Sequence, residues 1–136
     1  MSYRPTKTSR MRSFALTGRR LAGVQALFYL VTGVWPLLHM RSFEAITGPK
    51  MDRWLVKTVG VLVIAIGGSL GLAARAERTT PEIALLGAGS AGGLAAIDIV
   101  YVAKRRISPV YLLDAAAELV LVAAWILIRP WHQRGD

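Results

Sequence analysis

Three carboxylates lie inside long apolar stretches of the sequence, and their side chains have the clearest capacity for chemistry. Asp98 lies in "GLAAIDIVYVA", and Asp114 and Glu118 lie in "YLLDAAAELVLV". A carboxyl group can exchange protons, bind a cation or anchor a polar ligand. Because a charged group in apolar surroundings is costly, such residues usually face a bundle interior or a cavity. We therefore take these three as candidate site residues.

The spacing places the three carboxylates near one end of the elements that carry them. Asp114 and Glu118 are four residues apart, so a helix presents them on one face. At a rise of about 1.5 Å per residue, Asp98 and Asp114 both lie roughly 9 Å from the same loop, and Glu118 roughly 15 Å. We therefore expect a common polar pocket that opens toward one membrane face, with Glu118 deepest, near the midplane of the bilayer.

The elements that must position these residues are four apolar segments of about 20 residues, the length that crosses a bilayer core as a helix. They cover 21–38, 54–74, 83–102 and 110–128. Each is apolar on nearly every face, which is not typical of a soluble domain. The sequence predicts an all-α fold, a four-helix transmembrane bundle. The single domain would cover 21–130, between a basic disordered tail (1–20) and a short polar tail (131–136).

Composition excludes several kinds of function. The 136-residue chain is 54% hydrophobic, carries a net charge of +9 and has no cysteine, so thiolate metal sites and thiol nucleophiles are excluded. Its basic residues flank the apolar segments, where they favour anionic lipid headgroups. We expect membrane lipids as partners, with a homo-oligomer or a partner membrane protein, and neither nucleic acid, a metal nor a cofactor.

Capping residues support the expected helix limits. In "TTPE", Thr80 is placed as an N-cap, Pro81 as the first helical residue and Glu82 at the positive end of the helix dipole. Ser108 and Pro109 repeat the pattern, and Pro49 is expected to begin the second span. The tryptophans are expected at span ends, as interfacial aromatics: Trp35, Trp54, Trp125 and Trp131.

A glycine motif in the third segment has two interpretations. Gly87, Gly89 and Gly92 form G-x-G-x-x-G, which is typical of dinucleotide-binding turns. That turn requires a following helix, a second strand and an acidic residue about twenty positions on. The chain continues instead as an unbroken apolar segment to Lys104. We therefore interpret the motif as part of a membrane helix.

Small residues in the second and third segments indicate close helix packing. Gly60, Gly67 and Gly71 share one face of the second span, and Gly89 and Gly93 have small-xxx-small spacing in the third. Small residues let helix backbones approach closely in lipid. We expect the second and third spans to cross glycine to glycine.

Polar residues expected on the same membrane side supply partners for the carboxylates. His39, Glu44 and Lys57 lie there, and Lys57 is on the glycine face of the second span. An ion pair of Lys57 with Asp98 or Asp114 is predicted, with Arg41 and Arg53 as alternatives. Gln25, Tyr29 and Thr32 add a polar stripe to the first span.

These residues allow three functions. The leading hypothesis is a non-enzymatic accessory or amphiphile-binding protein with a polar pocket near one membrane face. A membrane enzyme that uses Asp98, Asp114 and Glu118 as acid–base groups is an alternative, and an oligomeric proton-coupled transporter is another. Carboxylates that serve only as structural ion pairs are the simplest alternative to all three.

The whole-chain pattern resembles that of small bacterial membrane proteins of the DoxX-like type. The basic lead-in "RRLAGVQALFYLVTGV" and the glycine-rich "VGVLVIAIGGSLGLA" carry this resemblance, which covers roughly residues 19–128. It implies a four-helix fold and an accessory role in the bacterial inner membrane, and it assigns no site residue. The distribution of Lys and Arg favours both termini in the cytoplasm, but only when the basic residues of the N-terminal tail are counted.

Overall fold

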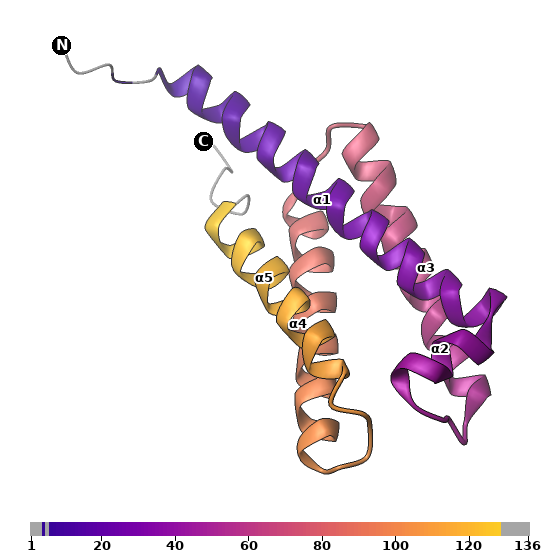
Figure 1. The fold of residues 1–136 in the computed structure, drawn as a ribbon. Helices are drawn as coiled ribbons and strands as arrows, with labels where there is room; N and C mark the ends of the chain where they lie inside the picture. Colours follow the sequence, from indigo (N-terminus) through magenta and orange to yellow (C-terminus); the bar gives the residue numbers. More distant parts are fainter. Residues whose placement is uncertain (1–3, 5, 129–136) are drawn as a thin grey trace.

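Five helices account for most of the part of the chain that the structure, a computed structural model, describes (residue 4 and residues 6–128; Figure 1). They are α1 (Lys7–Leu38), α2 (Met40–Thr47), α3 (Arg53–Arg75), α4 (Pro81–Ala103) and α5 (Tyr111–Ile128). Four stretches are long and apolar enough to cross a membrane: Leu16–Leu38 within α1, and the whole of α3, α4 and α5. The prediction of an all-α fold with four spans is confirmed, and the chain is an integral membrane protein.

The N-terminal part of the chain differs from the disordered tail predicted for 1–20. Helix α1 begins at Lys7, well before the apolar segment, and Thr6 caps it by accepting a 3.3 Å hydrogen bond from the N–H of Ser9. Arginine, lysine, methionine and leucine have high helix propensity, so a helix that is anchored in the membrane can extend through such residues. The predicted tail at 131–136 lies outside the described residues.

The predicted start of α4 is confirmed, and α3 begins within one residue of the predicted span 54–74. Thr80 caps α4 by accepting from the N–H of Ile83 at 3.3 Å, and Pro81 is the first helical residue. Helix α3 begins at Arg53 rather than at Pro49. The preceding turn contains Gly48 at φ 94°, a left-handed conformation that glycine adopts without strain.

Two helices end in the same hydrogen-bonded turn without the usual glycine. After α3, Glu77 adopts φ 56° and the N–H of Arg78 bonds the carbonyl of Ala73 at 2.9 Å. After α4, Arg105 adopts φ 57° and the N–H of Arg106 bonds the carbonyl of Tyr101 at 2.9 Å. This is the Schellman motif, in which a left-handed residue satisfies the last carbonyls of the helix.

The helices pack as two pairs: α1 lies along α3, and α5 lies along α4, with less contact between the pairs (Figure 1). The first pair crosses at Gly33 and Gly60, where a Cβ added to either residue would lie 2.8 Å from the other's carbonyl oxygen. A Cβ on Gly67 would meet the Tyr29 Cβ at 3.0 Å, and one on Gly71 the Ala26 Cβ at 3.6 Å. The glycine face of α3 therefore packs on α1, and the predicted glycine crossing between the second and third spans is wrong.

Gly87 is the glycine of α4 that makes the close contact in the second pair. A Cβ there would collide with the indole of Trp125 on α5. By contrast, a Cβ on Gly89 would meet only Leu85 Cδ1, at 3.9 Å, and one on Gly93 would meet nothing within 4 Å. The small-xxx-small pair of α4 therefore faces outward. The G-x-G-x-x-G motif lies wholly inside the continuous helix α4, so it forms no dinucleotide-binding turn.

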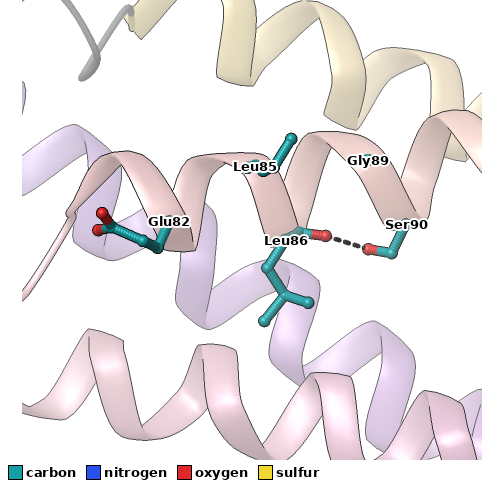
Figure 2. Close-up of a pocket in the computed structure, with 5 residues that line it drawn as sticks. All are labelled: Glu82, Leu85, Leu86, Gly89 and Ser90. Carbon is teal, nitrogen blue, oxygen red and sulfur yellow. Dashed lines mark hydrogen bonds between the residues drawn. The ribbon is translucent and has the colours of Figure 1, made fainter.

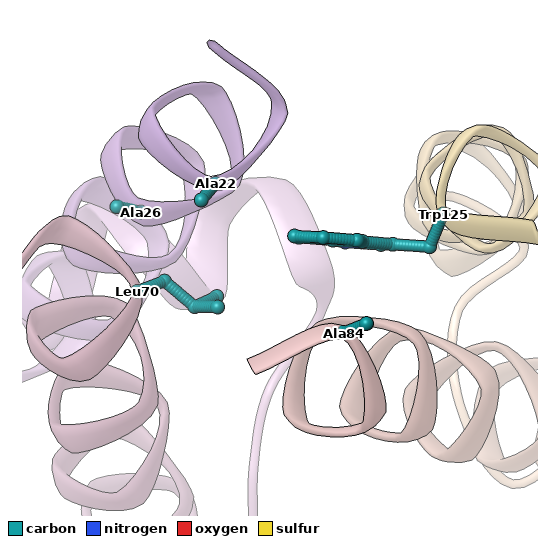
Figure 3. Close-up of a cluster of buried hydrophobic side chains, with 5 residues drawn as sticks. All are labelled: Ala22, Ala26, Leu70, Ala84 and Trp125. Carbon is teal, nitrogen blue, oxygen red and sulfur yellow. The ribbon is translucent and has the colours of Figure 1, made fainter. Parts of the chain in front are cut away.

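The core between the two pairs is built on Trp125. Its ring projects from α5 toward α1, with Ala84 of α4 on one side and Leu70 of α3 across from it (Figure 3). The side chain is fully buried, at 0% exposure, whereas Trp54 at the start of α3 is 66% exposed. Trp125 was predicted as an interfacial aromatic because it is near the end of its span. It is buried instead because alanines and Gly87 leave room for its ring.

Candidate functional site: a buried polar network and an acid pair

Gln25 joins the two helix pairs through its side-chain amide. Its Nε2 donates a 2.9 Å hydrogen bond to the carbonyl of Gly87 on α4, and its Oε1 accepts one of 2.7 Å from the indole Nε1 of Trp125 on α5. All these groups are buried, so the network satisfies three polar groups that would otherwise be costly in the membrane. The two bonds also determine which end of the amide carries the oxygen.

Tyr29 lies one helical turn beyond Gln25 and reaches the deepest carboxylate. Its hydroxyl donates a 2.8 Å hydrogen bond to Oε2 of Glu118 and lies 3.4 Å from the hydroxyl of Ser90. Ser90 itself donates to the carbonyl of Leu86 at 2.5 Å. Glu118 is only 1% exposed. The carboxylate predicted to be near the midplane is therefore held by a tyrosine from another helix, rather than by a base.

Asp98 and Asp114 lie side by side where α4 and α5 come together, and we call them the acid pair. Asp98 is 6% exposed, and Asp114 is half-buried. Within the described part of the chain, Oδ2 of Asp98 is the one buried side-chain polar atom without a hydrogen-bond partner. Glu118 is close enough to interact with both members of the pair. The three predicted carboxylates are thus gathered on one interface, as expected.

The other three candidate residues do not join this cluster. Lys57 is exposed, and the described residues include no ion pair made by it, so the predicted bridge to Asp98 or Asp114 is not formed. His39 caps α2 instead, and its Nδ1 accepts a 3.1 Å hydrogen bond from the N–H of Ser42. The glycine face of α3, on which the sequence places Lys57, packs on α1 rather than on α4.

Glu44 forms an ion pair on the surface between α2 and α3. Its two carboxylate oxygens accept from Nε and Nη2 of Arg53 at 2.8 and 2.9 Å, a bidentate geometry. The hydrogen bond from Arg53 holds the pKa of the Glu44 carboxyl below its usual value. Arg53, considered as an alternative partner for the buried carboxylates, is therefore engaged with Glu44.

Two lysines at this end of the bundle lie over aromatic rings. The ammonium of Lys50 lies 4.6 Å from the ring centroid of Tyr111, and that of Lys104 lies 5.7 Å from that of Tyr101. These distances are typical of cation–π contacts. Lys50 also donates to the carbonyl of Thr47 at 3.1 Å. Lys104 is six residues after Asp98, and Lys50 contacts Tyr111, three residues before Asp114. The contacts described for both lysines are nevertheless with rings and a carbonyl.

A hollow of about 380 Å³ lies along the outer side of α4 (Figure 2). We call it the α4 groove; it is lined by Glu82, Leu85, Leu86, Gly89 and Ser90. Glu82 lies at the start of the helix, the two leucines form the walls, and the Ser90 hydroxyl turns back to the carbonyl of Leu86. The groove is lined by none of the six candidate residues, and it lies in the other half of α4 from the acid pair.

Gln25 and Tyr29, which the sequence presents only as part of a polar stripe, are the residues that connect the two helix pairs. The signal was present, because a glutamine and a tyrosine four residues apart in an apolar span must find hydrogen-bond partners. What the sequence did not contain was the identity of those partners, which depends on how the pairs associate.

The polar groups gathered between α4 and α5 are carboxylates and hydroxyls. The described residues include no group of three or more histidine or carboxylate side chains arranged to hold a metal ion. Among the described residues, the side chain that interacts with Asp98 is that of Asp114, which is not basic. The site thus offers anionic oxygens and a shared hydroxyl network, which can hold a cation or an amphiphile's polar group.

Comparisons with known proteins give no relative: no protein-family model, no curated protein and no solved structure matches the chain.

Proposed function

We propose that this integral membrane protein is a non-enzymatic binding protein for an amphiphile, whose alkyl chain lies in the α4 groove. The observation that carries the proposal is the groove itself, an open and almost wholly apolar hollow beside Leu85, Leu86 and Gly89, with Glu82 and Ser90 at its two ends. Its volume of about 380 Å³ is within the usual range for small-molecule sites, roughly 300–1,000 Å³.

The groove has the dimensions and polarity of a single alkyl chain with a polar end. From Glu82 to Ser90 the helix rises about 12 Å. Glu82 is exposed near the end of the span, at the depth of lipid headgroups, whereas Gly89 is well inside the span. An amphiphile could therefore enter sideways from the bilayer, with its polar group near Glu82 and its chain along the leucines.

Native mass spectrometry of the detergent-solubilised protein tests this proposal, because it reports bound amphiphile and oligomeric state together. Gly89→Leu should fill the groove, since a Cβ there meets only the flexible end of Leu85. We expect this variant to carry at least tenfold less bound amphiphile than the unaltered protein. Gly93→Leu is the matched control: it adds the same side chain to the same helix outside the groove lining, and it should retain binding.

Equal retention in both variants would contradict the proposal, as would an unaltered protein that carries no amphiphile. The sequence-based expectations of a DoxX-like relationship, the bacterial inner membrane, cytoplasmic termini and a homo-oligomer stay predictions. An enzyme or a proton-coupled transporter stays an alternative.

A further inference from the structure

We propose that the acid pair, Asp98 and Asp114, is the binding site of a primary ammonium group. The starting point is Oδ2 of Asp98, which is buried without a hydrogen-bond partner among the described residues although its residue is only 6% exposed. A buried polar atom without a partner needs an explanation, and an ion bound at that atom is one. This site is separate from the α4 groove and does not depend on it.

The charge of the pair indicates a cationic ligand. A second carboxylate, Asp114, lies beside Asp98, and Glu118 is near enough to interact with both. Two carboxylates together at low dielectric repel each other unless a cation or a proton lies between them. A cation bound between the two carboxylates would relieve this repulsion, whereas an anionic head group would increase it.

The cationic side chains at this end of the bundle do not neutralise the pair in the described structure. Arg53 is held by both oxygens of Glu44. The other cationic side chains here are exposed and make none of the described ion pairs: Arg41, Lys57, Arg105 and Arg106. Lys50 and Lys104 lie over tyrosine rings. A positive charge beside the acid pair would therefore come from a bound ligand.

An ammonium group fits the donor set better than a metal ion does. An ammonium has three N–H donors and can be satisfied by the oxygens of two carboxylates. Ca²⁺ and Mg²⁺ require six or more oxygen ligands. The buried residues one turn before Asp98 and next to Asp114 are Ala95 and Ala115, whose side chains supply no oxygen. Helix carbonyls at this depth are used within α4 and α5.

The depth of the pair allows a ligand to enter from the membrane surface. Asp114 is three residues from the start of α5 and half-buried, so its Cα is about 5 Å from the helix end; that of Asp98 is about 8 Å from the end of α4. The amine could be carried by an amphiphile in the outer part of the bilayer or by a small soluble molecule. Both sources present the same group to the carboxylates.

Isothermal titration calorimetry of the full chain in phosphatidylcholine nanodiscs tests the assignment, because the trimethylammonium of that lipid has no N–H to donate. The probes are dodecylamine, butylamine and, as the uncharged comparison, dodecanol. We expect dodecylamine to bind at least tenfold more tightly than dodecanol. Butylamine binding at the same site would identify free amines as ligands, and binding of dodecylamine alone would identify amphiphiles; either result supports an ammonium site.

Matched variants locate the binding. Asp98→Asn and Asp114→Asn should each remove the preference for amine over alcohol. Asp52→Asn removes the same charge from an exposed residue on the same membrane side and should leave the preference intact. Gly89→Leu should also leave it intact, which separates this proposal from the α4 groove.

Equal affinity of the unaltered chain for amine and alcohol would overturn the proposal, and that comparison needs no variant to fold. An equal loss of preference in Asp52→Asn and Asp98→Asn would also overturn it. In either case, the acid pair would be a self-contained contact between α4 and α5.

Discussion

The hydroxyl of Tyr29 on α1 donates a 2.8 Å hydrogen bond to the buried carboxylate of Glu118 on α5, which lies 89 positions later in the chain. Together with the two hydrogen bonds of Gln25, this contact connects the two helix pairs, which otherwise make few contacts with each other. Association of helices in lipid has no hydrophobic driving force, so packing and interhelical hydrogen bonds determine it. The polar network therefore sets how the two pairs are oriented.

Tyr29→Phe should destabilise the protein by about 1–3 kcal/mol, because Glu118 loses its donor in a buried position. Reversible unfolding in mixed detergent micelles measures this change. Tyr101→Phe is the matched control: Tyr101 is 40% exposed, and the ring that faces Lys104 is retained. Equal stability of Tyr29→Phe and Tyr101→Phe would show that the buried hydrogen bond contributes nothing.

Gly60→Ala should weaken the packing of α1 on α3. The added Cβ would lie 2.8 Å from the Gly33 carbonyl oxygen, which belongs to a helix backbone and cannot move alone. We expect a loss of about 1–3 kcal/mol, the usual cost of overpacking. Gly68→Ala, in the same helix with open space at its Cβ, should instead gain up to about 1 kcal/mol from helix propensity. Similar unfolding midpoints for the two variants would contradict this crossing.

Arg105→Gly should stabilise the protein by about 1 kcal/mol, because Arg105 adopts a left-handed conformation at φ 57° and glycine does so without steric cost. Arg105→Ala removes the same charge and keeps the Cβ, so the difference between the two variants isolates the backbone effect. Unfolding in micelles is again the measurement. An Arg105→Ala variant as stable as Arg105→Gly would show that the gain does not come from the backbone.

The pair of Glu44 and Arg53 should respond to acid. Since the pKa of Glu44 is lowered from its ordinary 4.5, the pair stabilises the fold above that value. The contribution is lost as the pH falls through the lower, folded-state pKa. Carbon NMR of the Glu44 carboxyl should show a midpoint below 4.5, rising in Arg53→Gln. Arg41→Gln, at an exposed residue outside the pair, should leave the midpoint unchanged; an unchanged midpoint in Arg53→Gln would contradict the pairing.

The existence and limits of the spans could be predicted because bilayer thickness imposes them. The observed spans differ from 54–74, 83–102 and 110–128 by no more than two residues at each end. Thr80 and Pro81 marked the start of α4 because capping is a local property of the chain.

Which faces meet could not be predicted in the same way. All four spans are apolar on every side, so hydrophobic pattern does not separate a lipid-facing glycine such as Gly93 from one at a crossing such as Gly60. The burial of Trp125 depended on space left by Gly87, a residue distant in sequence. The gathering of Asp98, Asp114 and Glu118 was predictable because their depths follow from the spans. Their partner Tyr29 was not, since α1 could have packed on them in several rotations.

The division into two helix pairs also bears on how the protein is made. The α1–α3 pair is complete in sequence at Arg75, before α4 begins at Pro81, so its glycine crossing can form while the rest of the chain is still being synthesised. The α4–α5 pair then docks through side chains, and Gln25 and Tyr29 make the hydrogen bonds described across that seam, next to the cation–π contact of Lys50 with Tyr111. Residues 1–78 and 79–136, produced as separate polypeptides in one membrane, are therefore expected to complement each other, with reassembly depending on those two side chains.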